Sequence, residues 1–414
     1  MDNKNRTSLG LAFSVGITAF AAHAGGGFAT GNQANTYFVS LGWVGIFSAL
    51  LAMLVLALSV REGQLMWNIT GSKSYKELFA HLFHPFDKLS LVFDVFYDIM
   101  ILMVVASCIA GVASALKTYF GLDYYVGAVL VGIVILLLSI FGAEIIRKAN
   151  TYMGICILVL SLVIYCTGLL KSTDFAVKFT NNLAAQGASN IFAAVKNALI
   201  YAGFQWVTIP AVLACGTVLK TKKDCTAGMI FTFVFNCLGL GISVIMLYAW
   251  SDYFMNIDGG STLPTLSTLM HMDMGFLVVL YVAALFLCMV SSGVAVVFGF
   301  INRFENSAFL NGIKNTHVKR SGIAVFIMAF SMFISFAGLT NVVKYGYGYC
   351  GYLGLFGAAL PLLTVGFYKN RKWLRECSDG NRILPANASD SQEEHRTGHQ
   401  RSFSGKLQTA GSED

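Results

Sequence analysis

Charged residues are scarce in this chain of 414 residues. Asp, Glu, Lys and Arg make up only 12% of it, whereas hydrophobic residues make up 56%. A soluble domain carries roughly 25% charged residues, so the composition excludes an ordinary soluble protein. The Lys and Arg residues lie between apolar runs rather than in one patch. The net charge of +7 therefore does not indicate nucleic acid as a partner.

Motifs of catalytic and metal-binding sites are also missing. The nine Cys lie mostly inside apolar runs and none forms a C-x-x-C pair, so neither a disulfide framework nor a zinc site is indicated. No G-x-S-x-G or H-E-x-x-H motif is present. The sequence therefore predicts no enzyme, no metal site and no cofactor, with Na⁺ considered only as a coupling ion.

Long apolar runs recur along most of the chain, and each is long enough to cross a bilayer core of ~30 Å. They predict an all-α polytopic membrane protein with about ten spans, at residues 8–38, 41–60, 89–117, 124–141, 150–170, 191–215, 229–248, 274–301, 323–337 and 342–368. A partly amphipathic stretch is expected at 61–88 and a surface segment near 263–271. The polar tail at 376–414 is predicted to be disordered.

The distribution of basic residues predicts the orientation. If both termini are cytoplasmic, 19 Lys and Arg residues outside the tail fall on the cytoplasmic side. Only five fall outside or within spans, namely Lys117, Lys171, Lys178, Lys196 and Lys344. Cytoplasmic loops of membrane proteins carry such an excess. We therefore expect a multi-pass protein of the cell membrane with both termini in the cytoplasm.

Two predicted spans are interrupted by glycine and polar residues in mid-membrane. The first contains AGGGFATGNQ at 24–33, and the sixth contains YAGFQWVTIP at 201–210. Non-helical backbone at that depth survives only where it lines a cavity or is buried in protein. Glycine clusters also serve close helix packing. Two clusters in corresponding positions, each flanked by polar side chains, favour a binding site.

The two breaks predict how the halves are related. Gly25 and Gly203 are 178 residues apart, and each lies in the first helix of a five-helix half. Because five is odd, the second half must be inserted upside down relative to the first. The prediction is a five-plus-five inverted repeat, with residues 1–170 as the first repeat, 171–375 as the second and 376–414 as a cytoplasmic tail.

The first break carries a resemblance to a known family. Residues 25–31, Gly-Gly-Gly-Phe-Ala-Thr-Gly, resemble the Gly-x-Gly-Phe-Ala-x-Gly motif of the YkvI-like amino acid permease family, within the amino acid–polyamine–organocation superfamily. The likeness covers about residues 8 to 370. That family commonly has Gln-Glu after the last glycine, where this chain has Asn32-Gln33, so no role of that carboxylate carries over. The resemblance implies the inverted-repeat fold of the neurotransmitter:sodium symporters and transport of a small amino-acid-like solute by alternating access.

The first break is predicted to bind the solute. Freed N–H groups at the start of the outer half-helix attract a carboxylate, and glycine lets the backbone approach it. We assign Gly25, Gly26 and Gly27 to this role. The other predicted solute contacts are His23, Phe28, Tyr201, Gly203, Phe204 and Gln205. Aromatic side chains beside a helix break serve equally well in packing.

A cation site is predicted next to the solute. The carbonyls of Ala21 and Ala24, at the end of the inner half-helix, suit a cation. In the sodium symporters a pair of hydroxyls in the eighth span coordinates Na⁺ with such carbonyls, and the resemblance assigns this role to Ser291 and Ser292 with the carbonyl of Cys288. Hard oxygen ligands suit Na⁺. The alternative is that these hydroxyls bond to carbonyls of their own helix.

His23, Asp94 and Asp98 are ionisable residues within predicted spans, where such groups are functional by default. His23 changes charge near neutral pH, so proton uptake there is an alternative to Na⁺ coupling. The other interpretation is a neutral histidine that holds the break in shape. Asp94 and Asp98 lie four apart on the third span and are either functional or partners of Lys88.

These patterns predict a secondary active transporter that moves an amino acid or amino-acid-like solute and is coupled to Na⁺ or H⁺. Its expected partners are the solute and the lipid bilayer. The alternatives are a membrane sensor that binds solute without transporting it and a membrane enzyme. The missing catalytic motifs count against the enzyme, and the absence of a recognisable domain in the tail counts against the sensor.

Overall fold

The computed structural model describes residues 9–23, 26–141, 156, 159–305, 307, 310 and 312–376. Every regular element within these ranges is helical. Seven of the helices are long and apolar enough to cross a membrane, or nine if each of two bent pairs is counted as one span. The chain is therefore an all-α polytopic membrane protein, as predicted.

The first half of the chain supplies these helices: α1 (Leu9–His23), α2 (Gly26–Ala29), α3 (Asn32–Tyr37), α4 (Trp43–Thr70), α5 (Tyr75–Phe83), α6 (Ser90–Phe120) and α7 (Tyr124–Phe141). The second half supplies α9 (Phe175–Gln186), α10 (Ile191–Phe204), α11 (Ile209–Cys215), α12 (Lys222–Asn236), α13 (Ile242–Phe254), α14 (Pro264–His271), α15 (Gly275–Phe304), α16 (Thr316–Ser335), α17 (Leu339–Asn341), α18 (Gly348–Gly354) and α19 (Phe367–Glu376). π-Helical turns join α12 to α13 and link α17, α18 and α19 into one long span. The fifth predicted span is represented by Val159–Leu170, and its earlier part lies outside the described residues.

The second span is longer than predicted. Helix α4 continues past Val60 to Thr70, where the sequence predicts an amphipathic stretch. The polar residues of this last part face protein instead of water. Asn68 Nδ2 donates to the carbonyls of Gly216 and Leu219, at 3.2 and 2.8 Å. Gly71 then ends the helix in the left-handed conformation, with φ of 65°.

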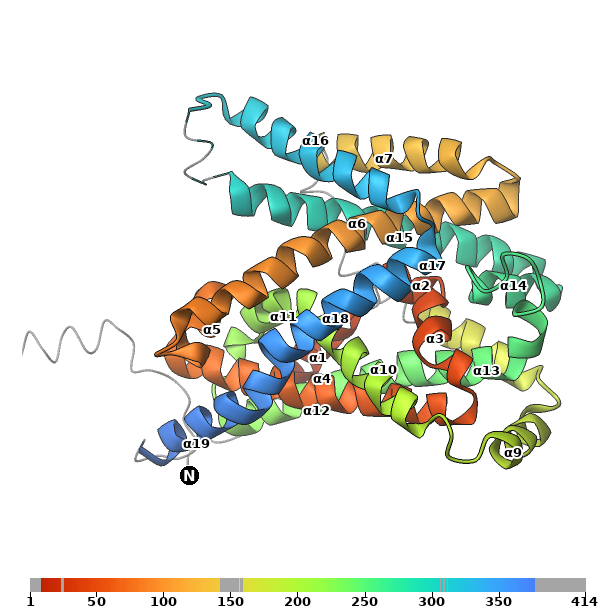
Figure 1. The fold of residues 1–414 in the computed structure, drawn as a ribbon, viewed down its shortest axis with the longest axis horizontal. Coiled ribbons are helices and arrows are strands. Elements are labelled where there is room, and N and C mark those ends of the chain that lie inside the picture. Colours follow the sequence, from red (N-terminus) through yellow and green to blue (C-terminus); the bar gives the residue numbers. More distant parts are fainter. Residues whose placement is uncertain are drawn as a thin grey trace, which may run out of the picture.

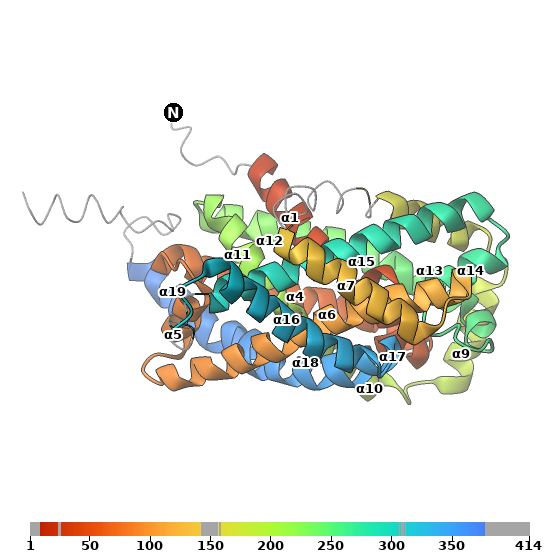
Figure 2. The same cartoon turned by 90° about the horizontal axis from the view of Figure 1, so that it is seen from above.

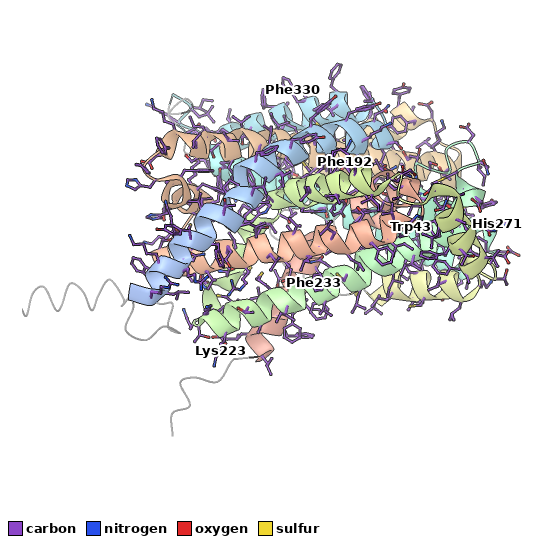
Figure 3. All side chains as sticks on the ribbon, turned by 60° about the horizontal axis from the view of Figure 1, so that its bottom comes forward. Trp43, Phe192, Lys223, Phe233, His271 and Phe330 are labelled. Atoms are coloured by element: carbon purple, nitrogen blue, oxygen red, sulfur yellow. The ribbon has the colours of Figure 1, made fainter. Side chains whose placement is uncertain are left out.

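The molecule is elongated, and its two ends carry different elements. Helices α5, α11 and α19 lie toward one end, and α9, α13 and α14 toward the other (Figures 1 and 2). Lys223 and His271 mark these opposite ends in Figure 3. The long sides between them expose apolar rings, such as Phe330 and Phe192, whose exposed fractions are 51% and 82%. Such a surface fits the hydrocarbon core of a bilayer.

Helix packing follows the pairing that an inverted repeat requires. Helix α1 packs on α12, and the corresponding helix of the other half, α10, packs on α4. In the same way α7 packs on α15 while α16 packs on α6, and the α6–α7 contact recurs as α15–α16. Each contact therefore recurs when spans one to five are exchanged with spans six to ten. The repeat boundaries at residues 170 and 375 stay a prediction.

Asp94 and Asp98 bind Arg303 of α15, and not Lys88. The Asp94 and Asp98 carboxylates lie 3.0 and 3.2 Å from the guanidinium. The Tyr75 and Tyr97 rings each lie 5.2 Å from the same group. Because α6 and α15 pack together, the cation comes from a helix more than 200 residues away in sequence. The cluster joins the two halves near the end of the molecule that carries α5.

Candidate functional site

The first span is interrupted, as its glycines predict. Helix α1 is described as far as His23, and the next described helix, α2, covers Gly26–Ala29. Ala24 and Gly25 lie outside the described residues. The interruption among the described residues lies between α2 and α3, at Gly31, which has a φ of 77°. A Cβ there would lie 2.4 Å from Thr265 Oγ1, so both the conformation and the space require glycine.

The sixth span is broken slightly later than its glycine suggests. Helix α10 runs through Gly203 to Phe204, and a short 3₁₀ turn at Gln205–Val207 follows. The two parts of the span are bent by 61°. Pro210 explains the break, because its ring would clash with the carbonyl four residues earlier and it has no N–H to donate. It lies instead in the first turn of α11, where proline is tolerated.

His23 joins the two broken spans. Its Nε2 lies 2.8 Å from the hydroxyl of Tyr201 in α10, and its Nδ1 contacts the amide oxygen of Asn236 in α12. The ring is 4% exposed. His23 and Tyr201 are 178 residues apart, the same separation as Gly25 and Gly203. Equivalent positions of the two halves therefore meet, as residues near the two-fold axis of an inverted repeat must.

The partners of His23 determine where its hydrogens lie. Asn236 Nδ2 donates to the Thr232 carbonyl at 2.9 Å, so Asn236 Oδ1 accepts from His23 Nδ1. In the neutral ring Nε2 then has no hydrogen and accepts from the Tyr201 hydroxyl. That hydroxyl has a second acceptor, Gln33 Oε1, at 3.2 Å.

This arrangement tolerates a proton. If His23 becomes an imidazolium, Nε2 donates to Tyr201, and Tyr201 turns its own hydrogen to Gln33. Protonation leaves Asn236, His23 and Tyr201 each with a partner, and it gives Gln33 Oε1 the Tyr201 hydrogen that points to His23 in the neutral state. The polar contacts of His23 itself therefore fit both protonation states, through rotation of the Tyr201 hydroxyl.

Aromatic rings surround the His23–Tyr201 contact. Phe28, a predicted solute contact, lies 5.5 Å from the His23 ring. Tyr201 packs on Phe204 and on Phe38, with centroids 4.7 and 5.0 Å apart. The cluster extends through Tyr37 and Tyr347, which each lie within 5.3 Å of Phe204. Of the predicted solute contacts, the structure thus brings together His23, Phe28, Tyr201 and Phe204.

Sequence reasoning missed several members of this site, above all Asn236, Gln33 and the ring of Tyr37. Asn236 is a buried amide inside an apolar span, and that placement is a signal the sequence does contain. Tyr37 and Gln33 follow the first break, but nothing in the sequence shows which helix they face.

Gly203 lies at a helix contact. A Cβ on Gly203 would lie 2.1 Å from the Gly351 carbonyl oxygen and 2.7 Å from the Leu355 backbone nitrogen. The backbones of α10 and the tenth span therefore touch, which is the packing role that glycine clusters also serve. Gln205 is buried, with 4% exposure, in the turn that follows. Both positions stay predictions as solute contacts.

The structure describes only part of the predicted cation site, because Ala24 lies outside the described residues. Ser291 Oγ donates to the Cys288 carbonyl at 3.0 Å, the bond within one helix that the sequence left open as an alternative. A carbonyl oxygen has two lone pairs, so this bond does not by itself exclude Na⁺. Nearby, Tyr281 donates to the Ala29 carbonyl at 2.7 Å. A cavity of about 10 Å³ lies beside Cys288, Tyr281 and Ser161, which is room for about one water-sized particle.

Comparison with solved structures decides the fold. A Na⁺-coupled sialic acid symporter, solved in a substrate-bound outward-open state, superposes with a TM-score of 0.53 over 83% of this chain and 78% of the symporter. The chain has the fold of that symporter. The sequences are 13% identical, so the likeness concerns the fold alone. No family model and no curated protein matches the chain.

Proposed function

We propose that this protein is a secondary active transporter that moves an amino-acid-like solute across the cell membrane by alternating access. The observation that carries the proposal is the His23–Tyr201 hydrogen bond, which joins the two broken spans of a symporter fold. Paired broken helices in inverted halves form the binding site in transporters of this architecture. A contact between the halves at that site changes whenever one half rocks against the other.

Proton coupling is the mechanism that the site supports best. The hydrogen-bond chain through His23 accepts a proton without losing a partner, and imidazole is the side chain that changes charge near neutral pH. A solute carboxylate near the break favours the imidazolium, since opposite charges stabilise each other. Solute binding then draws in a proton, and solute release lets it go.

Sodium coupling is the second candidate, because the similar solved structure is a Na⁺-coupled symporter and the sequence predicts Na⁺ ligands at Ser291 and Ser292 of α15. If Na⁺ is the coupling ion, Ser291→Ala with Ser292→Ala abolishes Na⁺-dependent uptake, because two oxygen ligands are lost. Uptake into proteoliposomes with and without a Na⁺ gradient measures this. Ser335→Ala, which removes a buried hydroxyl bonded to its own helix in α16, should leave uptake unchanged. Uptake by the parent protein that ignores Na⁺ would eliminate this candidate.

The proposed function is tested with the purified full-length protein and a panel of amino acids, to which sialic acid is added. A solute that binds only the folded protein stabilises it by ~2.7 kcal/mol at a concentration of 100 Kd. We expect at least one amino acid to raise the unfolding temperature and to enter proteoliposomes. Binding without uptake would support the sensor instead, and a panel without any stabilising solute would contradict the proposal.

A further inference from the structure

A second cavity, remote from the broken spans, opens at the end of the molecule that carries α19. It has a volume of about 450 Å³, within the range of ~300–1,000 Å³ typical of ligand pockets. Residues of three elements line it, namely α4, the start of α12 and α19. The positive-inside distribution of Lys and Arg predicts that this end faces the cytoplasm. The cavity therefore lies where the membrane surface is expected.

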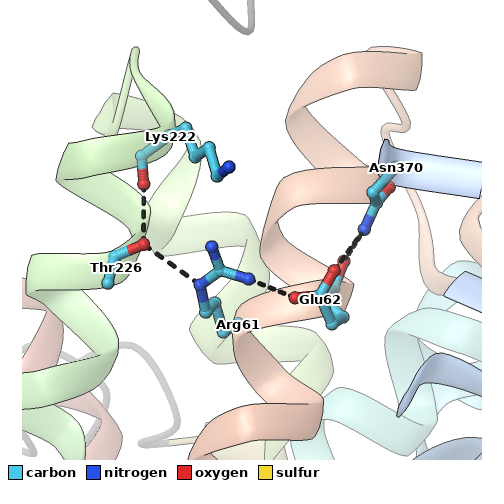
Figure 4. A network of polar contacts seen from close by, with 5 residues as sticks. All are labelled: Arg61, Glu62, Lys222, Thr226 and Asn370. Carbon is cyan, nitrogen blue, oxygen red and sulfur yellow. Dashed lines mark hydrogen bonds and ion pairs between the residues drawn. The ribbon is translucent and has the colours of Figure 1, made fainter. Parts of the chain in front are cut away.

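Polar residues that line this cavity are hydrogen-bonded to one another and to α12. The Glu62 carboxylate contacts the Arg61 guanidinium and accepts from Asn370 Nδ2 at 2.9 Å (Figure 4). Arg61 Nε donates to Thr226 Oγ1 at 3.0 Å, which ties α4 to α12. Glu62 is thus already paired, with 6% of its side chain exposed. Its charge is balanced by Arg61 and does not compensate other cations around the cavity.

Three further cations line the same cavity. Lys222 comes from α12, and Arg371 and Arg375 come from successive turns of α19. All three are exposed, and among the described residues none of them forms an ion pair. Positive charges gathered around one cavity repel each other and attract an anion. Apolar side chains, Leu65, Phe367 and Leu374, line it as well.

We propose that this cavity binds the phosphate of an anionic phospholipid headgroup. Arg371, Arg375 and Lys222 surround the phosphate, and arginine pairs with phosphate oxygens through two parallel hydrogen bonds. The apolar residues beside them accommodate the glycerol and the start of the acyl chains. Basic pockets between membrane helices on the cytoplasmic side bind such headgroups. Because Lys222 belongs to α12 and both arginines belong to α19, a lipid bound by all three also ties α19 to α12. The proposal is independent of the transport function.

The test uses the purified full-length protein in neutral detergent, titrated with phosphatidylglycerol, with phosphatidylcholine or with inorganic phosphate. Bound lipid is counted by native mass spectrometry, and the unfolding temperature is followed in parallel. We expect phosphatidylglycerol to bind and stabilise more strongly than phosphatidylcholine. Arg371→Gln with Arg375→Gln should weaken phosphatidylglycerol binding about thirtyfold, equivalent to ~2 kcal/mol. Lys372→Gln is the matched control, since Lys372 is an exposed cation of the same helix outside the cavity lining.

The outcomes separate the sources of the phosphate. Lys222→Gln, on a different helix, should weaken phosphatidylglycerol binding as well, which keeps the test valid if the double variant folds poorly. Equal binding of the two lipids, or loss of binding in Lys372→Gln to the same extent, would overturn the proposal. A third result would also overturn the proposal. If inorganic phosphate stabilises the parent protein as much as phosphatidylglycerol does, and this stabilisation is lost in Lys222→Gln, the cavity binds a free anion instead of a lipid.

Discussion

His23→Gln is expected to abolish both the pH dependence of uptake and the accumulation of solute against its gradient. Glutamine keeps a hydrogen-bonding side chain toward Tyr201 and Asn236 but has no group that titrates near neutral pH. One proton per solute, driven by one pH unit, supports about tenfold accumulation, since one unit corresponds to ~1.4 kcal/mol. The variant should lose this factor and only equilibrate the solute. Proteoliposomes with an imposed pH gradient and no Na⁺ provide the measurement.

A second histidine serves as the control. His271 of α14 stacks on Tyr253 at 3.6 Å near the opposite end of the molecule from α19, and His271→Gln should keep the pH profile of the parent protein. Tyr201→Phe removes the acceptor of the His23 proton and should slow uptake while the pH dependence remains. If His23→Gln still accumulates solute with the parent's pH profile, His23 only holds the two broken spans together and proton coupling through it is refuted.

Gly203→Ala is expected to lower the free energy of unfolding by about 3 kcal/mol, the upper part of the range for overpacked cores. The added methyl group would lie 2.1 Å from a carbonyl oxygen and 2.7 Å from a backbone nitrogen of the tenth span. Backbone atoms cannot move aside singly, so α10 and α18 must separate. Because α10 also carries Tyr201, we expect the His23–Tyr201 contact to weaken and uptake to fall. Unfolding in a denaturant series and uptake assays measure the two effects.

Gly348→Ala is the matched change in the same helix pair. Its methyl group would meet only the Tyr37 hydroxyl, at 3.5 Å, which is an ordinary contact. Alanine is also the better helix former by ~1 kcal/mol, so stability should be unchanged or slightly higher. A Gly203→Ala protein that is as stable as the parent but no longer binds solute would show that Gly203 contacts the solute, as the sequence predicts.

The sequence predicts the spans well because their causes are local. A run of apolar residues has to cross the bilayer wherever its neighbours lie, and α4, α6, α7, α15 and α16 are all found where such runs occur. The breaks are local for the same reason. A proline such as Pro210 or a positive φ such as that of Gly31 interrupts a helix through its own backbone.

The end of a span is predicted less well than its existence. Arg61–Thr70 continues α4 because Asn68 finds carbonyl partners near α12, and those partners are about 150 residues away in sequence. The same limit applies to Arg303, whose position among apolar residues does not show that it faces Asp94 and Asp98.

By itself the sequence determined the class of protein, the helical spans and the two breaks, because each depends on residues within one helix. Only the tertiary structure decided which residues meet at the breaks. His23 faces Tyr201 and Asn236, and Gly203 contacts Gly351, across 178, 213 and 148 residues. Side chains on a helix point in all directions, and the packing of distant helices selects which of them become partners.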